Sequence, residues 1–261
     1  MHFKPKKSLG QNFLIDQNIQ RKIIYACNFN SSDIVLEIGA GRGELTRLIA
    51  PRVKKVYALE LDTDLCRILK DNLKAYSNAE IINQDILKLN FYSRFRKLEN
   101  KLNVIGNIPY YIATPILERL LKFRELIEEI YVTVQKEFAA RIIARPGSKD
   151  YGSLSCFLQY YSEPKISFLI KKTCFFPSPK VDSCFLSLKI RSKYPIDLKT
   201  ERRFFRITRT AFNQRRKTLR NSLKDVIPQQ KLYAFFKEYN INANVRPEEL
   251  TISDFLHLAN L

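Results

Sequence analysis

The residues with the clearest chemical potential in this chain stand at the ends of hydrophobic runs. Three of its seven glycines, Gly39, Gly41 and Gly43, fall within five positions after one such run and before a helical stretch. A tight turn of this kind needs positive φ angles and lets a ligand approach the backbone, which a Cβ would hinder. An acid stands two residues before the first glycine, and the GxGxG spacing differs from the GxGxxG of dinucleotide folds. The pattern therefore favours another cofactor.

Carboxylates follow the next two hydrophobic runs. Glu60 stands 21 residues after Gly39, at the end of the run 55–59. A carboxylate in this place can accept hydrogen bonds from both hydroxyls of a ribose. Asp85 follows the run 80–82 and on its own could simply cap a turn. Because ligands of open α/β sheets gather outside the carboxyl ends of the strands, we predict that both carboxylates bind the cofactor.

The fourth hydrophobic run ends in Gly106-Asn107-Ile108-Pro109-Tyr110, which indicates the reaction. An amine conjugated to a ring is a poor nucleophile because its lone pair is delocalised. The side-chain oxygen of Asn107 and the carbonyl of Ile108 can accept both amine hydrogens and so leave the lone pair free to attack. Pro109 fixes the turn, and Tyr110 can stack on the base. The chemistry predicted here is orientation of the amine and stabilisation of the charge that develops on nitrogen.

The glycine turn and the three strand ends resemble the motifs of class I S-adenosylmethionine-dependent methyltransferases. This resemblance implies that Gly39 and Gly41 lie against the methionine and ribose portions of the cofactor. It also implies that Asp85 meets the amino group of the cofactor's adenine. With no CxxC pair and only two histidines, near opposite ends of the chain, we expect no metal to take part.

Three further sequence motifs add to this resemblance. They are Lys6-Lys7-Ser8-Leu9-Gly10-Gln11-Asn12-Phe13-Leu14, Gln135-Lys136-Glu137 and Phe175-Phe176-Pro177-Ser178-Pro179-Lys180-Val181-Asp182-Ser183. Together, these motifs, in this order along the chain, make almost the whole chain similar to the rRNA adenine N6,N6-dimethyltransferase family, the KsgA-type small-subunit enzymes. One departure is Ile108, where leucine is common in that family.

The family resemblance implies further site residues and a substrate. Asn12 and Leu14 would touch the cofactor, and Phe175 would give the flipped base a second stacking face. The implied reaction is dimethylation of two adjacent adenosines in the 3′-terminal hairpin loop of small-subunit (16S) rRNA, with S-adenosylmethionine as donor. The implied partner is the immature 30S subunit, during ribosome biogenesis.

The charge of the chain favours a nucleic-acid partner. With 45 Lys and Arg against 26 Asp and Glu, its net charge is +19. The segment 202–224 holds nine basic residues and no acidic one, with Phe and Leu at helical spacing. Part of this segment should pack and present its cations on a fixed surface. The residues predicted to contact RNA are Arg215, Arg216, Lys217 and Arg220.

The elements that position these residues alternate apolar β-branched runs with helical patterns, which indicates a mostly parallel sheet covered by helices. Expected strands span 34–38, 55–59, 80–82, 102–105, 130–134, 165–169 and 184–190, the last two as a pair at one edge with an antiparallel member. Expected helices span 44–50, 64–74, 115–122 and 136–144, then 199–212, 218–224, 229–239 and 248–258. We predict an α/β class I methyltransferase, Rossmann-like catalytic domain over 1–194 and a small all-helical, basic rRNA-binding domain over 195–261.

Other features of the sequence bear on the cellular location of the protein and on alternative functions. The longest uncharged stretch, 102–117, has 16 residues, fewer than the roughly 20 that span a bilayer. With no signal-peptide pattern and no CxxC pair, we expect a cytoplasmic monomer without a membrane segment or a zinc site. The rivals are large-subunit (23S) rRNA methylation of the macrolide-resistance type, amide or DNA-adenine methylation, and a non-catalytic ribosome-assembly factor. The intact motifs argue against a non-catalytic assembly factor, and the basic segment 202–224 argues against the large-subunit target.

Overall fold

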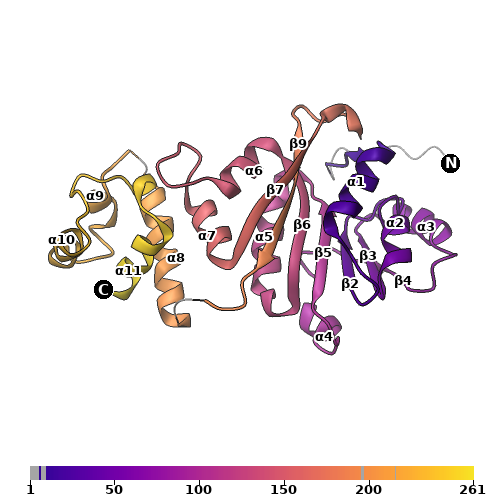
Figure 1. Cartoon of the computed structure of the whole chain (residues 1–261), viewed down its shortest axis with the longest axis horizontal. Coiled ribbons are helices and arrows are strands. Elements are labelled where there is room, and N and C mark those ends of the chain that lie inside the picture. The colour runs from indigo at the N-terminus through magenta and orange to yellow at the C-terminus, as the bar shows by residue number, and fades with distance from the viewer. Residues whose placement is uncertain (1–5, 7–9, 195–196, 215) are drawn as a thin grey trace. The chain divides into compact units, whose positions relative to one another are not determined.

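The computed structural model of the chain describes residues 6, 10–194, 197–214 and 216–261, and only the backbone of Leu198. It divides into two compact units (Figure 1). Unit 1 comprises Met1–Ala139 and Lys165–Ile190, and unit 2 comprises Ala140–Pro164 and Arg191–Leu261. Unit 2 begins close to the boundary predicted after residue 194. It also takes in a segment, Ala140–Pro164, that we expected to belong wholly to the first domain.

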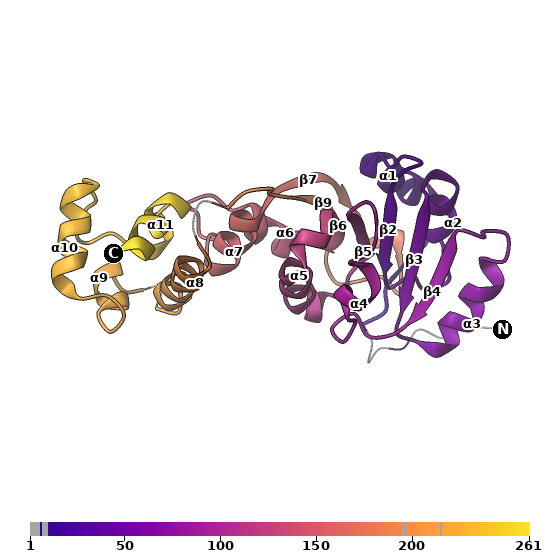
Figure 2. The same ribbon diagram turned by 90° about the horizontal axis from the view of Figure 1, so that it is seen from below.

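A seven-stranded sheet forms the core of unit 1 (Figure 2). Its strand order is β4-β3-β2-β5-β6-β9-β7. The strands are β2 (Ile34–Ile38), β3 (Lys55–Glu60), β4 (Ala79–Asn83), β5 (Leu102–Asn107), β6 (Ile127–Gln135), β7 (Ser162–Ile170) and β9 (Ser183–Ile190). Strands β2 to β6 are parallel to one another, and β9 runs antiparallel to its neighbour β6. The predicted mostly parallel sheet with an edge pair is confirmed.

Helices cover both faces of this sheet, which explains why all five residues of β2 are buried. On one face, Val35 and Val56 pack in a cluster with residues of α1 (Gln17–Cys27) and α2 (Thr46–Ile49). On the other face, Tyr57 contacts Phe95 of α4 (Phe91–Phe95). The other helices are α3 (Thr63–Asn72), α5 (Ala113–Lys122) and α6 (Lys136–Ile143), the last of which continues into unit 2 after Ala139. Short 3₁₀ turns lie at Ala50–Arg52, Tyr110–Ile112, Arg124–Leu126 and Lys172–Cys174.

The strand order brings the predicted site residues together. The sheet grows in opposite directions from β2 and β5, so the crevice for a ligand lies between these two neighbouring strands. Ile38, which precedes the glycine turn, pairs with Gly106, which precedes Asn107. On the next strand, Glu60 at the end of β3 pairs with Asn83 at the end of β4.

Unit 2 contains the helices of the carboxyl-terminal region. They are α7 (Ser153–Tyr161), α8 (Leu198–Phe212), α9 (Leu219–Leu223), α10 (Gln229–Glu238) and α11 (Ile252–Asn260), with a 3₁₀ turn at Pro247–Glu249. Helix α7 was not predicted, and it packs against α8. Its Tyr161 hydroxyl donates to the buried carboxylate of Glu201 at 2.8 Å, which helps explain why this segment belongs to unit 2.

No helix among the described residues is long and apolar enough to cross a membrane. The same part of the chain has no group of three or more His, Cys, Asp or Glu side chains that could hold a metal ion.

Candidate active site

A pocket at the carboxyl ends of the strands in unit 1 holds most of the predicted site residues. Its atoms surround about 880 Å³ of space. The predicted residues that line it are Asn12, Gly39, Gly41, Glu60, Asp85, Asn107, Ile108, Pro109 and Tyr110. Sequence reasoning missed the apolar lining, which includes Phe13, Leu61, Ile86, Tyr111 and Ile116. Single apolar residues carry no signal of this kind, because they look the same in a core and in a pocket wall.

The glycine turn after β2 keeps its backbone in the left-handed region. Gly39 and Gly41 have φ angles of 72° and 61°. The N–H of Gly39 donates to the Leu59 carbonyl at 2.8 Å, which ties the turn to the end of β3. A Cβ built on Gly39 would have no protein atom nearer than 3.9 Å. The turn therefore leaves free space in front of its backbone, as close approach of a ligand requires.

The carboxylate of Glu60 is fixed by the backbone around it. One oxygen accepts from the N–H of Gly41 at 2.8 Å, and the other accepts from the N–H of Asp62 at 2.9 Å. Burial raises the pKa of Glu60, while these backbone donors act in the opposite direction. A carboxylate has about four acceptor positions, so each oxygen retains capacity for a ligand hydroxyl.

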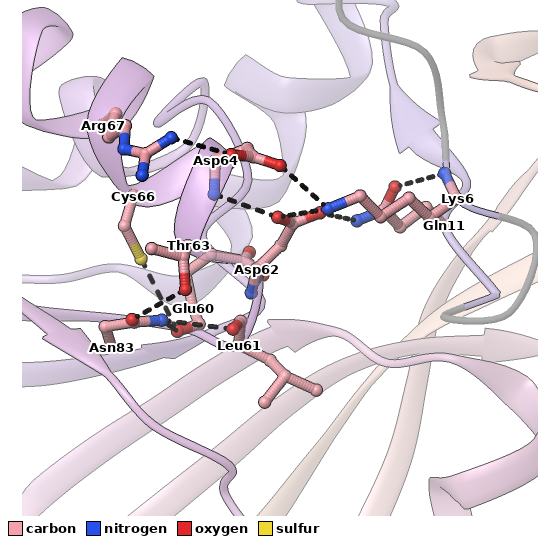
Figure 3. A network of polar contacts seen from close by, with 10 residues as sticks. All are labelled: Lys6, Gln11, Glu60, Leu61, Asp62, Thr63, Asp64, Cys66, Arg67 and Asn83. Carbon is pink, nitrogen blue, oxygen red and sulfur yellow. Dashed lines mark hydrogen bonds and ion pairs between the residues drawn. The ribbon is translucent and has the colours of Figure 1, made fainter.

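The amino-terminal segment is tied to the residue that follows this strand end (Figure 3). The Lys6 Nζ lies 2.8 Å from the buried Oδ1 of Asp62, and the Gln11 amide donates to the other oxygen at 3.3 Å. Burial disfavours the charged form of Asp62. The hydrogen bonds from Lys6, the Asp64 backbone and Gln11 outweigh that effect and lower the Asp62 pKa. This tether holds the chain near Gly10 as one wall of the pocket.

Asn107 is oriented by the same amino-terminal segment. Its Nδ2 donates to the Asn12 carbonyl oxygen at 2.7 Å. This bond uses one of the two N–H groups and holds the side chain in place, and the amide oxygen remains to accept from a ligand. The backbone N–H of Ile108 donates to the Thr133 carbonyl at 3.3 Å, which fixes the turn after β5 to β6.

Tyr110 and Asp85 are each held by one hydrogen bond on the protein side of the pocket. The Tyr110 hydroxyl lies 2.8 Å from the Ser183 Oγ, and burial raises the pKa of this tyrosine. The phenol is therefore a neutral, positioned ring. Asp85 lines the pocket and also caps a turn, because its Oδ1 accepts from the Leu87 N–H at 2.8 Å. Its other oxygen makes no hydrogen bond with the described part of the chain.

Comparison with known proteins identifies the family to which this arrangement belongs. Residues 2–261 match the family described as ribosomal RNA adenine dimethylase. This chain belongs to that family. It is 42% identical to the ribosomal RNA small subunit methyltransferase A of Geobacillus thermodenitrificans (strain NG80-2), over 99% of this chain and 91% of the relative. It is 41% identical to the protein of the same name from Caldanaerobacter subterraneus subsp. tengcongensis, over 98% and 97% of the two chains.

Solved structures agree with this membership. A dimethyladenosine transferase from Plasmodium falciparum superposes with a TM-score of 0.82 at 26% identity, covering 94% of this chain and 95% of the other. The 23S rRNA methyltransferase ErmE superposes with a TM-score of 0.74 at 25% identity, covering 95% and 100%. The predicted class I methyltransferase fold is confirmed.

Two residues assigned from the family resemblance lie outside the pocket lining. Strand β1 (Phe13–Leu14) pairs antiparallel with β8 (Phe175–Phe176), so that Leu14 faces Phe175 and Phe13 faces Phe176. Leu14 and Phe175 are 7% and 2% exposed and belong to the hydrophobic cluster that includes Val35, Val56 and residues of α1 and α2. Phe13 lines the pocket, and Phe176 is 58% exposed. Sequence reasoning could not see this alternation because the two strands are far apart in the chain.

The predicted RNA-binding residues lie in unit 2, apart from Arg215, which is outside the described residues. Arg216 and Lys217 are exposed, and no hydrogen bond or ion pair engages either side chain among the described residues. Arg220 is partly engaged, because it donates to the Tyr233 hydroxyl at 2.7 Å. The packing residues that flank them are Phe212 and Leu219, both buried.

Proposed function

We propose that this protein transfers methyl groups from S-adenosylmethionine to N6 of two adjacent adenosines in the 3′-terminal hairpin loop of small-subunit rRNA. It would act as a cytoplasmic monomer during assembly of the small subunit. The observation that carries the proposal is the orientation of Asn107, whose donor is engaged by the Asn12 carbonyl while its oxygen is left for a ligand in the pocket. The relatives named ribosomal RNA small subunit methyltransferase A support the choice of subunit.

The residues of the pocket fit the proposed cofactor. Gly39 leaves open space for the methionine portion. Glu60 would accept from the ribose hydroxyls, and the second oxygen of Asp85 would accept from the adenine amino group. Ile86 and Ile108 supply apolar surface in the same lining for the faces of the adenine ring. When bound, S-adenosylmethionine supplies the electrophilic methyl group.

The chain's own contribution to the reaction is to prepare the amine. In the first transfer the Asn107 oxygen and the Ile108 carbonyl would accept the two N6 hydrogens and draw the nitrogen away from planarity, so that its lone pair can attack. In the second transfer one N–H remains to be accepted. Fixed dipoles aimed at developing charge are worth about 10²–10³ in rate for a single group. After transfer the nitrogen carries a positive charge and loses a proton to water, because none of these groups is a general base.

We place the target base against the Tyr110 ring and propose Phe176, in place of Phe175, as the second aromatic surface. Phe175 is buried in the core, whereas Phe176 is exposed and pairs across the strands with the pocket residue Phe13. Replacing Phe176 by Leu should therefore slow transfer more than replacing Phe175 by Leu in a protein of equal stability. A larger loss of transfer with the Phe175 variant would make Phe175 the stacking residue instead.

We further propose that residues 1–194 form the catalytic domain and that 195–261 form the rRNA-binding domain, with Arg215, Arg216, Lys217 and Arg220 at its RNA contact. The absence of acidic residues from 202–224 supports this division. Basic side chains without acidic partners contribute to RNA affinity by releasing counterions from phosphates.

Large-subunit rRNA methylation is the second candidate, and the fold likeness to the 23S rRNA methyltransferase ErmE favours it. Two observations count more heavily for the small subunit. The identity to the small-subunit relatives is 42% against 25% for ErmE. The basic segment 202–224 also resembles the corresponding segment of the small-subunit enzymes.

The substrate is tested by incubating the protein and labelled S-adenosylmethionine with immature small subunits, with large subunits and with duplex DNA, and then mapping the labelled nucleotides. We expect two adjacent dimethyladenosines near the 3′ end of the small-subunit rRNA and no label elsewhere. Asn107→Ala serves as the control for transfer by contaminating enzymes. Label confined to the large subunit or to DNA would contradict the proposal, and binding of small subunits without any transfer would favour an assembly factor.

A further inference from the structure

We infer that unit 1 has a phosphate-binding pocket of its own, separate from the cofactor pocket, which takes the backbone of the substrate RNA. A second cavity of about 1140 Å³ lies among α1, the glycine turn, α2 and the end of α3. Three arginines line it, Arg21 from α1, Arg42 from the glycine turn and Arg47 from α2, against a single carboxylate, Glu44. The cavity is therefore strongly electropositive.

The donors of these arginines are only partly used. Arg42 pairs with Glu44 at 2.7 Å, yet its Nε is buried without a hydrogen-bond partner in the described part of the chain. The Nε of Arg47 donates to the Gly43 carbonyl at 3.3 Å, which leaves the two terminal nitrogens of its guanidinium for a ligand. Arg21 is exposed and makes no hydrogen bond or ion pair among the described residues.

Several other cations of unit 1 differ from Arg21 and Arg47, because an acid lies beside them. Lys54 pairs with Glu99, Lys74 with Asp71 and Arg67 with Asp64. These pairs are exposed and contribute little to stability, but they cancel charge locally. The second cavity therefore concentrates positive charge that the protein itself leaves uncompensated.

Neighbouring groups hold this pocket in shape. The Asn72 amide donates to the Arg42 carbonyl at 2.8 Å, and the buried Gln20 amide donates to the Leu14 carbonyl at 2.7 Å. The guanidinium carbon of Arg42 also lies 5.5 Å from the centroid of the Phe13 ring. Arg42 is thus held from several sides, and a phosphate meets a charge that is already positioned.

The size and chemistry of the cavity favour RNA over a free anion. Its arginines come from three segments and line a space comparable with a pocket for a drug-sized ligand. A single inorganic phosphate would fill only a part of it. Guanidinium groups also bind phosphate oxygens in a fork that matches a phosphodiester. The identity of the RNA rests on the proposed function, whereas the pocket itself does not.

The test compares two double variants that remove the same charge. Arg21→Gln with Arg47→Gln changes the cavity, and Arg52→Gln with Arg67→Gln removes two arginines of unit 1 that do not line it. Binding of immature small subunits is measured at several salt concentrations for both variants and the wild type. All four side chains are exposed, so the fold should be retained, and unchanged S-adenosylmethionine binding checks this.

We expect the cavity variant to bind subunits more weakly and to flatten the slope of log affinity against log salt by as much as about 1.4–1.8, with no such change in the control variant. Equal slopes for the two variants would overturn the inference. The inference would also be overturned if inorganic phosphate bound in the cavity while replacement of Arg21 and Arg47 left RNA binding unchanged. The pocket would then serve a free anion. Failure of the proposed function has a different signature, namely no transfer by the wild type to any rRNA.

Discussion

The strand-end pocket of unit 1 and the basic segment 213–224 of unit 2 use polar side chains in opposite ways. In the pocket, each functional group has a partner that fixes it, as the Gly41 N–H fixes Glu60 and the Asn12 carbonyl fixes Asn107. In the basic segment, here the part of 202–224 that follows helix α8, Arg216 and Lys217 are exposed and free of such partners within the described residues. The function of the pocket thus depends on the positions of its polar atoms, whereas the RNA affinity of the segment depends on the number of its charges.

This difference has a physical consequence. Short hydrogen bonds in a buried site are little affected by ionic strength, whereas contacts between exposed cations and phosphates weaken steeply as salt rises. Changes in the pocket should therefore alter rate or cofactor affinity at any salt concentration. Changes in the segment should alter RNA affinity in a salt-dependent way.

The largest effect is expected from Asn107→Ala. This change removes the oxygen proposed to hold the amine in the transition state, so single-turnover transfer should fall by about 10²–10³ or more. Binding of S-adenosylmethionine and RNA should be nearly unchanged. Rapid-quench single-turnover measurements at saturating cofactor and subunits give the rate directly, and a rate near that of the wild type would remove Asn107 from the mechanism.

Asn107→Asp is the matched control for this residue. It keeps an acceptor oxygen but loses the N–H that donates to the Asn12 carbonyl. We expect a rate between those of the wild type and the alanine variant, because the acceptor remains and its orientation is lost. A rate equal to that of the alanine variant would show that orientation by Asn12 matters as much as the oxygen itself.

A smaller effect is expected from Glu60→Ala, which removes the acceptor for two ribose hydroxyls. Hydrogen bonds to a charged group are worth about 1.5–3 kcal/mol each, so the affinity for S-adenosylmethionine should fall at least about tenfold. Titration calorimetry measures this, with Glu80→Ala as control, since Glu80 lies on β4, pairs with Lys55 of β3 and does not line the pocket. Unchanged affinity in a folded Glu60 variant would refute the assignment.

The stability contributed by Glu37, which stands two residues before the glycine turn, should depend on pH. Burial raises the pKa of Glu37 to about 8, although the Thr46 hydroxyl donates to it. The native state therefore holds this proton more tightly than the unfolded chain does. The stability that Glu37 contributes is complete below its usual pKa of 4.5 and is lost as pH rises toward 8.

Glu37→Gln removes this dependence. Between these pH values, the free energy of unfolding of the variant should improve relative to the wild type by up to about 1.4 kcal/mol per pH unit, and no further above them. Denaturant unfolding at several pH values measures the difference. Glu128→Gln, on an exposed residue of β6, is the matched control for the loss of a glutamate side chain. A pH-independent difference for Glu37→Gln would mean that its carboxyl is ionised in the folded protein.

The smallest effect per residue is expected in the basic segment. Replacing Arg215, Arg216, Lys217 and Arg220 together by Gln should flatten the salt dependence of subunit binding by as much as about 3 units of slope. The reduction should be smaller if Arg220 keeps its contact with Tyr233. Exposed lysines of unit 2 outside the segment, Lys193, Lys199, Lys231 and Lys237, make the matched set for a control. Equal slopes in the two sets would place the RNA contact elsewhere.

The sequence predicts the parts of this comparison that depend on short-range pattern. The run Ile34–Ile38 is apolar because helices cover both faces of its strand, and it matches β2 residue for residue. Since parallel strands end on one side of a sheet, the amino-acid pattern alone suffices to group the strand-end residues Glu60, Asp85 and Asn107. All three line one pocket.

Long-range pairing accounts for what the sequence did not reveal. The ion pair of Lys6 with Asp62 joins residues 56 positions apart, and neither side chain has a distinctive local pattern. The pairing of β1 with β8 buries Phe175 and exposes Phe176, although the two are adjacent in the chain. Helix α7 is rich in aromatic residues and buried on much of its surface, so the amphipathic period that reveals other helices is weak there.

The most direct test of the division of labour is one data set in which single-turnover transfer is followed at increasing concentrations of immature small subunits. It compares the wild type, Asn107→Ala and the fourfold Gln variant of the basic segment. We predict that Asn107→Ala loses the maximal rate but keeps the subunit concentration for half-saturation. The basic variant should keep the maximal rate and need more subunits. If both variants lost the same parameter, the separation between a pocket built on position and a surface built on charge would be contradicted.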